Sequence, residues 1–121
     1  MNRVIRVISF VLSVTLLFLA FSITASAIAD SETGTYAGYS YCADVYAITG
    51  AYGSGFSYSG STIISMVGSA KMSYGGSISS FPLSKKGYSD INISGSVPGY
   101  TPVSASCAYR IGSVQITTLP N

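Results

Sequence analysis

The sequence contains no histidine and no tryptophan, and only 8% of its residues are charged, compared with about 25% in an ordinary globular protein. Histidine is the commonest general base and the commonest metal-ligating side chain in proteins. Its absence excludes every Ser-His-acid and Cys-His catalytic arrangement. The chain also lacks the Ser-x-x-Lys motif and the phosphate-binding loop that ends in Gly-Lys. We therefore expect no enzyme, no cofactor and no metal site.

Paired carboxylates could still catalyse glycoside hydrolysis without histidine. Away from Asp30 and Glu32, the only acids are Asp44 and Asp90. Acidic residues on strands are far more often solvated surface groups or turn caps than catalysts. The sequence therefore favours a structural role for both.

The N-terminus is typical of a secretory signal peptide. Arg3 and Arg6 precede an apolar stretch over residues 7–23, which ends in the small residues of 24–27. Ala25-Ser26-Ala27 fits a cleavage site, and a second candidate site ends at Ala29. We expect a signal peptide over 1–27, a single domain over 28–121 and a secreted, extracellular product. The alternative is a retained membrane anchor, because the apolar stretch approaches the roughly 20 residues needed to span a bilayer.

Charge in the expected mature domain is balanced. Removing Arg3 and Arg6 leaves four cations against four acids. Binding to nucleic acid or to anionic lipid needs a surplus of clustered cations. We therefore expect no nucleic-acid partner and no stable membrane association after signal cleavage.

The chain has two cysteines, Cys42 and Cys107. An even cysteine count in a small exported domain predicts a disulfide between them. Their spacing resembles the inter-sheet disulfide of immunoglobulin-like sandwiches, but no tryptophan is present and Ala105 stands where those domains carry tyrosine. The likeness is architectural, and we assign no family.

Serine and apolar residues alternate along three stretches of the mature chain, and this period of two is typical of half-exposed antiparallel strands. The pattern covers residues 56–78, 90–97 and 103–111. We expect turns near Gly68-Ser69 and Gly75-Gly76, and a bulge or sharp bend at Gly112, where the apolar parity changes. The expected fold is all-β, a small antiparallel β-sandwich or small barrel of about six strands.

In residues 35–52, both the odd-numbered and the even-numbered positions include apolar residues, and Cys42 and Asp44 lie at even positions. This pattern indicates either a central strand covered on both faces or a bulge near Cys42.

Ten tyrosines stand in the chain, and tyrosine gives a large amphipathic contact area at a low cost in conformational entropy. The candidate binding surface comprises Tyr36, Tyr39, Tyr41 and Tyr46. The structural alternative is that these tyrosines are ordinary strand residues with half-buried rings. We expect a secreted, non-enzymatic binding domain at or outside the cell envelope, with a protein or glycan partner. The alternatives are a structural, self-assembling exported protein, because low charge leaves strand edges unprotected, and a small secreted toxin or inhibitor.

Overall fold

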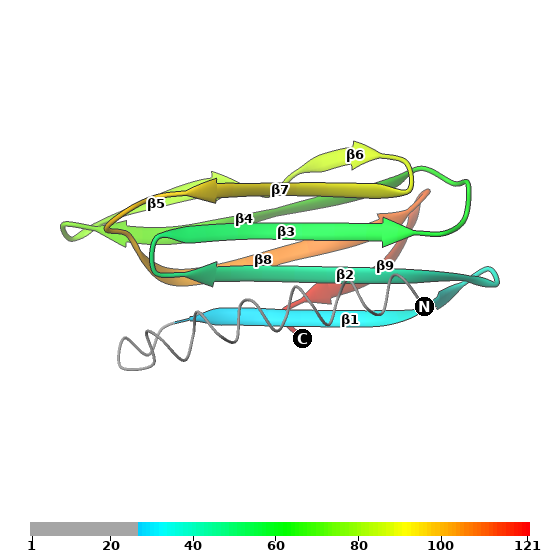
Figure 1. The fold of residues 1–121 in the computed structure, drawn as a ribbon, viewed down its shortest axis with the longest axis horizontal. Helices are drawn as coiled ribbons and strands as arrows, with labels where there is room; N and C mark the ends of the chain where they lie inside the picture. Colours follow the sequence, from blue (N-terminus) through cyan, green and yellow to red (C-terminus); the bar gives the residue numbers. More distant parts are fainter. Residues whose placement is uncertain (1–26) are drawn as a thin grey trace.

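The fold of residues 27–121, described by a computed structural model, is built of nine β-strands in two layers (Figure 1). The predicted signal peptide, residues 1–27, lies outside the described residues except for Ala27 and stays a prediction. No helix long and apolar enough to cross a membrane occurs in the described part of the chain. The strands are β1 (Ile28–Tyr36), β2 (Tyr39–Ile48), β3 (Ala51–Tyr58), β4 (Ile64–Tyr74), β5 (Ser77–Pro82), β6 (Lys85–Gly87), β7 (Asp90–Ser96), β8 (Thr101–Ile111) and β9 (Val114–Leu119).

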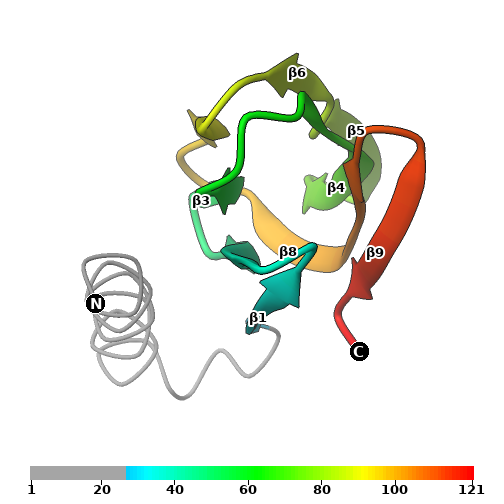
Figure 2. The same ribbon diagram turned by 90° about the vertical axis from the view of Figure 1, so that its right-hand side faces the viewer.

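The strands form two antiparallel sheets. Sheet A has the order β1-β2-β3-β7, and sheet B has the order β5-β4-β8-β9, with β6 paired to β4. The two layers are visible end-on in Figure 2. The predicted antiparallel all-β sandwich is therefore confirmed, but the expected count of about six strands is wrong. The additional strands escaped the pattern because β6 has only three residues and because β1 and β9 carry polar side chains on both parities.

The inner faces of the two sheets supply one continuous core. Ala43 and Val45 of β2 belong to this core together with Met66 and Met72 of β4, and all four side chains are fully buried. Full burial of a valine or methionine side chain stabilises the fold by about 1.5–3 kcal/mol. The other large side chains with almost no exposed surface are Phe56, Tyr58, Ile64, Leu83, Tyr109, Ile111 and Leu119.

Glycines mark one predicted turn and contradict another. Gly75 and Gly76 have φ of 58° and 85° and join β4 to β5, as predicted. The turn expected at Gly68-Ser69 is wrong, because β4 continues through it. A Cβ built on Gly68 would lie 2.6 Å from the Cα of Cys107, so this glycine permits close approach of β4 and β8.

Strand β8 follows the predicted alternation except at its beginning. Val103 was expected on the buried face, but it is 45% exposed, whereas Pro102 is buried. The pairing of β4 with β8 shifts register at Lys71, which exchanges the two faces beyond that point. The bend predicted at Gly112 is the turn of the β8–β9 hairpin, where Gly112 has φ of 60°.

Strand β2 is the central strand that the sequence left as one of two alternatives. It pairs with β1 on one side and β3 on the other without a register shift. Cys42 and Ile48 on its second parity are also buried. A bulge near Cys42 is therefore wrong.

The predicted disulfide is not formed. Cys42 alternates with the inward-facing residues Tyr41 and Ala43, so its side chain lies on the outer face of sheet A. Cys107 belongs to the core on the inner face of sheet B, and no disulfide joins the two residues. One sulfur points out of the sandwich and the other points into it. A bond between them would require one of the two strands to shift its register by one residue, so that its cysteine turns to the other face.

Candidate functional site

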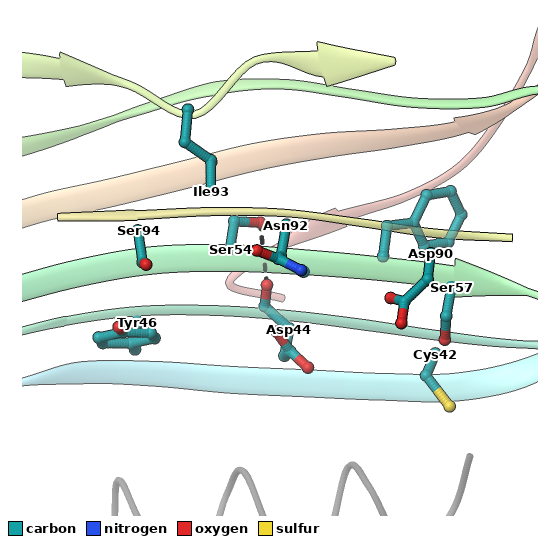
Figure 3. A pocket seen from close by; sticks show the side chains of 11 residues that line it. Cys42, Asp44, Tyr46, Ser54, Ser57, Asp90, Asn92, Ile93 and Ser94 are labelled. Atoms are coloured by element: carbon teal, nitrogen blue, oxygen red, sulfur yellow. Dashed lines mark hydrogen bonds between the residues drawn. The ribbon is translucent and has the colours of Figure 1, made fainter. Parts of the chain in front are cut away.

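The four tyrosines predicted as a binding surface do not form one surface. Tyr41 lies in the core, with only 8% of its surface exposed. Tyr36 and Tyr39 flank the β1–β2 turn, where both rings contact the buried ring of Tyr58. Tyr46 projects from the outer face of sheet A (Figure 3). The structure therefore brings Tyr36 and Tyr39 together and separates them from Tyr41 and Tyr46.

Three of the strand tyrosines lie over glycines on the neighbouring strand. Tyr41 covers Gly34, Tyr46 covers Gly53 and Tyr52 covers Gly95, and each pair is directly opposed in the sheet register. A large ring above a cross-strand glycine shields backbone that a glycine leaves bare. This arrangement gives these tyrosines a structural role in the sheet.

A hollow lies on the outer face of sheet A, over β2, β3 and β7 (Figure 3). The strand register arranges its polar residues in three rows across the strands. The rows are Cys42–Ser57–Asp90, Asp44–Gly55–Asn92 and Tyr46–Gly53–Ser94. Glycine in two of the rows leaves room, since a Cβ built on Gly55 would lie 2.9 Å from Oδ1 of Asp44.

The two acids of this hollow do not stand opposite each other. Asp44 and Asp90 occupy different rows and strands two positions apart in the sheet. Strand spacing and rise place their backbones about 12 Å apart. Direct cross-strand pairing of the carboxylates is therefore absent. No group of three or more metal-ligating side chains occurs among residues 27–121.

A cluster of nucleophilic side chains lies inside the core. The Ser54 Oγ is 2.6 Å from the Tyr109 hydroxyl, and the Cys107 Sγ is 3.5 Å from the carbonyl oxygen of Leu83. Burial raises the pKa of the Cys107 thiol and of the Tyr109 phenol. Both groups therefore keep their protons, and a protonated thiol in an apolar core is unreactive. This cluster links the sheets and offers no accessible nucleophile.

A row of four aromatic rings, three partly buried against the core and one exposed, lies at one end of the sandwich. We call Tyr52, Phe81, Tyr100 and Tyr74 the aromatic strip. Tyr52 stacks on Phe81 with ring centroids 4.9 Å apart, and Tyr74 stacks on Tyr100 at 5.0 Å. Phe81 meets Tyr100 edge-on at 5.8 Å, which makes the four rings continuous.

The strip is held by backbone as well as by ring contacts. The amide of Gly50 donates to the carbonyl of Tyr100 at 2.9 Å, and the amide of Val97 donates to the carbonyl of Gly50 at 2.8 Å. These bonds tie the β7–β8 turn to the β2–β3 turn. Gly99 permits the Tyr74 ring to lie against this turn, since a Cβ there would be 2.9 Å from Cε2 of Tyr74. The outermost ring, Tyr74, remains 57% exposed.

The sequence did not predict the aromatic strip because its members are far apart in the chain. They come from β3, β5, the β7–β8 turn and β4. The signal that could have located it is the position of each ring beside a predicted turn, since Tyr74 precedes Gly75-Gly76 and Tyr100 follows Pro98-Gly99.

Charge is separated between the two sheets, although the totals are equal. Among residues 27–121, the acids all lie on sheet A strands: Asp30, Glu32, Asp44 and Asp90. The cations all lie on sheet B strands: Lys71, Lys85, Lys86 and Arg110.

Two of the acids are engaged at the open side between the sheets. Glu32 accepts hydrogen bonds from the Tyr41 hydroxyl at 2.9 Å and the Thr117 hydroxyl at 3.0 Å. Asp30 accepts one from the amide of Asn121 at 2.7 Å. These bonds join β1 to the C-terminal strand of the other sheet, and Asp30 and Glu32 therefore have structural partners.

Comparison with known proteins gives no family for this arrangement. No protein-family model matches the chain, and neither the curated proteins nor the solved structures include a significant match.

Proposed function

We propose that the chain is a secreted, non-enzymatic binding domain that acts at or outside the cell envelope and contacts its partner through the aromatic strip. The observation that carries this proposal is a continuous row of four rings, fixed by contacts with one another and ending in the half-exposed Tyr74. Such rings supply broad amphipathic contact area and lose little conformational freedom on binding. They suit the faces of sugar rings or the apolar side chains of a protein.

The absence of histidine from the sequence supports a non-enzymatic role, as does the burial of the Ser54–Tyr109–Cys107 cluster. The signal-peptide pattern of residues 1–27 supports secretion. Expression of the full chain with sequencing of the released product tests this part of the proposal. The product should begin at Ile28 or at Asp30. A product that keeps residues 1–27 and stays with the membrane fraction would contradict secretion.

Binding through the strip is tested by retention on insoluble polysaccharides, namely cellulose, chitin and bacterial cell-wall material, and by capture of proteins from the same envelope preparation. The variant carries Tyr74→Ala and Tyr100→Ala. The control is Tyr88→Ala, because Tyr88 is 64% exposed and lies outside the strip. Retention should fall about tenfold or more in the double variant, as expected for loss of two aromatic contacts, and should be unchanged in the control. Equal retention of all three proteins would overturn the assignment of the strip.

Self-assembly is the second candidate, and one observation favours it. Two edge strands of sheet B, β5 and β9, carry no charged side chain, whereas the short edge strand β6 carries Lys85 and Lys86. Uncharged edges are prone to pair with further strands. Sedimentation velocity over a range of concentrations tests it. Concentration-dependent growth that Thr118→Lys suppresses would support assembly through β9, and a monomer at all concentrations would exclude it.

A further inference from the structure

The outer face of sheet B carries a row of two cations with a serine between them. Arg110 on β8 is paired in register with Ser65 on β4, and Ser65 is paired with Lys86 on β6. Because directly paired residues point to the same face, all three side chains share the outer face. The two cations are exposed and stand two strand spacings apart, about 10 Å.

This row lies in a hollow of the surface. Ser84, Lys85 and Gln115 complete its polar lining, and the lining contains no carboxylate. The Lys85 amine donates to the carbonyl of Asn92 at 3.2 Å and is partly engaged by the protein itself. Arg110, Lys86 and the two serine hydroxyls therefore supply donors with no acid beside them.

A third cation extends the face along β4. Lys71 is exposed and lies six residues beyond Ser65 on the same parity, which is about 20 Å along the strand. The intervening outer positions hold the apolar pair Val67 and Ala108 and then Ser69 opposite Ser106, with Ser104 opposite Lys71. The face thus carries serine hydroxyls and one apolar pair between widely spaced positive charges.

The spacing of these charges selects the ligand class. Double-stranded DNA carries one negative charge per about 1.7 Å of its axis, and its binding commonly uses six or more phosphate contacts. Three cations spread over about 20 Å match a polymer with far fewer charges per unit length. Hydroxyl donors between the cations match a ligand that also carries hydroxyls.

We propose that the outer face of sheet B binds an anionic polysaccharide with widely spaced acidic groups, one of which occupies the hollow between Arg110 and Lys86. This inference rests on the proposed function, because it names the partner class of a binding domain, but it uses a face separate from the aromatic strip. Because the numbers of cations and acids in the mature domain are equal, the sequence predicted no site for an anionic ligand. The placement of all four cations on sheet B strands creates such a site on that sheet.

The test measures binding of the mature domain to hyaluronan, which carries one carboxylate per disaccharide, at low salt. Neutral dextran, duplex DNA and phosphatidylglycerol vesicles are compared under the same conditions. Hyaluronan should bind and should dissociate as salt is raised, because exposed charges are screened. Dextran should not bind. Preferential binding of DNA or of vesicles would overturn the proposal in favour of a nucleic-acid or membrane surface.

The variant Lys86→Gln with Arg110→Gln removes two positive charges from the row. Its matched control, Thr35→Asp with Ser96→Asp, lowers the net charge equally but on exposed positions of sheet A. The first variant should weaken hyaluronan binding about tenfold, as expected for loss of two exposed charge contacts, and the control should bind within about twofold of the unmodified domain. Equal loss in both would show a net-charge effect and would overturn the site.

The Tyr74→Ala, Tyr100→Ala variant separates this inference from the proposed function. It should retain hyaluronan binding, since the strip lies apart from the row. Loss of retention on neutral polysaccharides with hyaluronan binding intact is the result expected of two sites. If retention on neutral polysaccharides depends on the aromatic strip but the domain does not bind hyaluronan, the inference alone is overturned. A domain that binds none of the probes in either experiment would overturn both the inference and the proposed function.

Discussion

The hydroxyl oxygens of Ser54 on β3 and Tyr109 on β8 lie 2.6 Å apart in the core, and both are within 2.9 Å of the carbonyl oxygen of Asp44 on β2. This group is a polar link between sheets A and B inside an otherwise apolar core. A buried hydrogen bond of this kind contributes about 1 kcal/mol, and an unsatisfied partner costs about 1–3 kcal/mol.

We predict that Tyr109→Phe lowers the free energy of unfolding by about 1–3 kcal/mol, because it removes the phenolic donor from a buried acceptor. Urea unfolding followed by circular dichroism measures the change. Tyr88→Phe is the control, since Tyr88 is exposed, and it should leave the stability unchanged. Indistinguishable midpoints for the two variants would contradict an energetic role for the link.

The stability of the fold should fall in strong alkali. Burial raises the pKa of Tyr41 to about 12, and its hydrogen bond to Glu32 acts in the same direction. In the unfolded chain the pKa of a tyrosine is about 10, so the folded state holds the phenolic proton of Tyr41 more tightly. The contribution is complete below pH 10 and is lost as the pH rises through 12. The pKa of Tyr109 is also raised by burial, which adds to the same trend.

Urea unfolding between pH 7 and 12 tests this dependence. We expect a level stability up to about pH 8, a first decline as the Cys107 thiol of the unfolded chain ionises at about pH 8.5, and a steeper decline above about pH 10. Tyr41→Phe removes one titrating group and should make the decline shallower while lowering the stability at neutral pH. A stability that rises between pH 10 and 12 would contradict the assignment.

Gly95→Ala should destabilise sheet A, because a Cβ at this position would lie 2.6 Å from Cε2 of the Tyr52 ring. Relief of such an overlap costs about 1–3 kcal/mol. The same displacement should disturb the stacking of Tyr52 on Phe81. Thermal unfolding and near-ultraviolet circular dichroism measure the two effects.

A double-variant cycle supplies the control for this overlap. In a Tyr52→Ala background the ring is gone, so Gly95→Ala should cost much less than it does in the native chain. Equal costs in both backgrounds would show that the glycine matters for a reason other than the tyrosine.

The product should contain no Cys42–Cys107 disulfide, because the side chains lie on the outer face of sheet A and in the core. Peptide mapping of non-reduced material by mass spectrometry checks this. Peptides that contain Cys42 and Cys107 should not be found linked to each other, and reducing agent should leave the unfolding midpoint of the monomer unchanged. A linked pair, or a midpoint that drops on reduction, would contradict the placement of the two strands.

Alternation of serine and apolar residues was sufficient to predict the strands that have one solvent-exposed face and one buried face. Ile91 and Ile93 of β7 point inward, and Asn92 between them is exposed, as the period of two requires. The pattern failed at Val103, because β8 carries one extra residue there relative to β4, and this irregularity exchanges the faces of β8 without interrupting its alternating sequence. It also failed for β1, whose inward positions carry Asp30 and Glu32.

The candidate sites were harder to predict than the strands because both depend on which strands become neighbours. Lys86 and Arg110 are 24 positions apart in the sequence. They lie on either side of Ser65 only because β6 and β8 both pair with β4. The disulfide prediction failed on the same ground. It relied on the number of cysteines and the expected compartment, whereas a bond between two sheets requires both sulfurs to point into the space between them.

The carboxylates of Asp30 and Glu32 on β1 give the outer edge of sheet A a safeguard against aggregation. Charged side chains that point inward from an edge strand penalise any further strand that docks beside it. A strand of a second molecule could extend sheet A beside β1 only by burying both charges, so growth of sheet A is opposed at this edge.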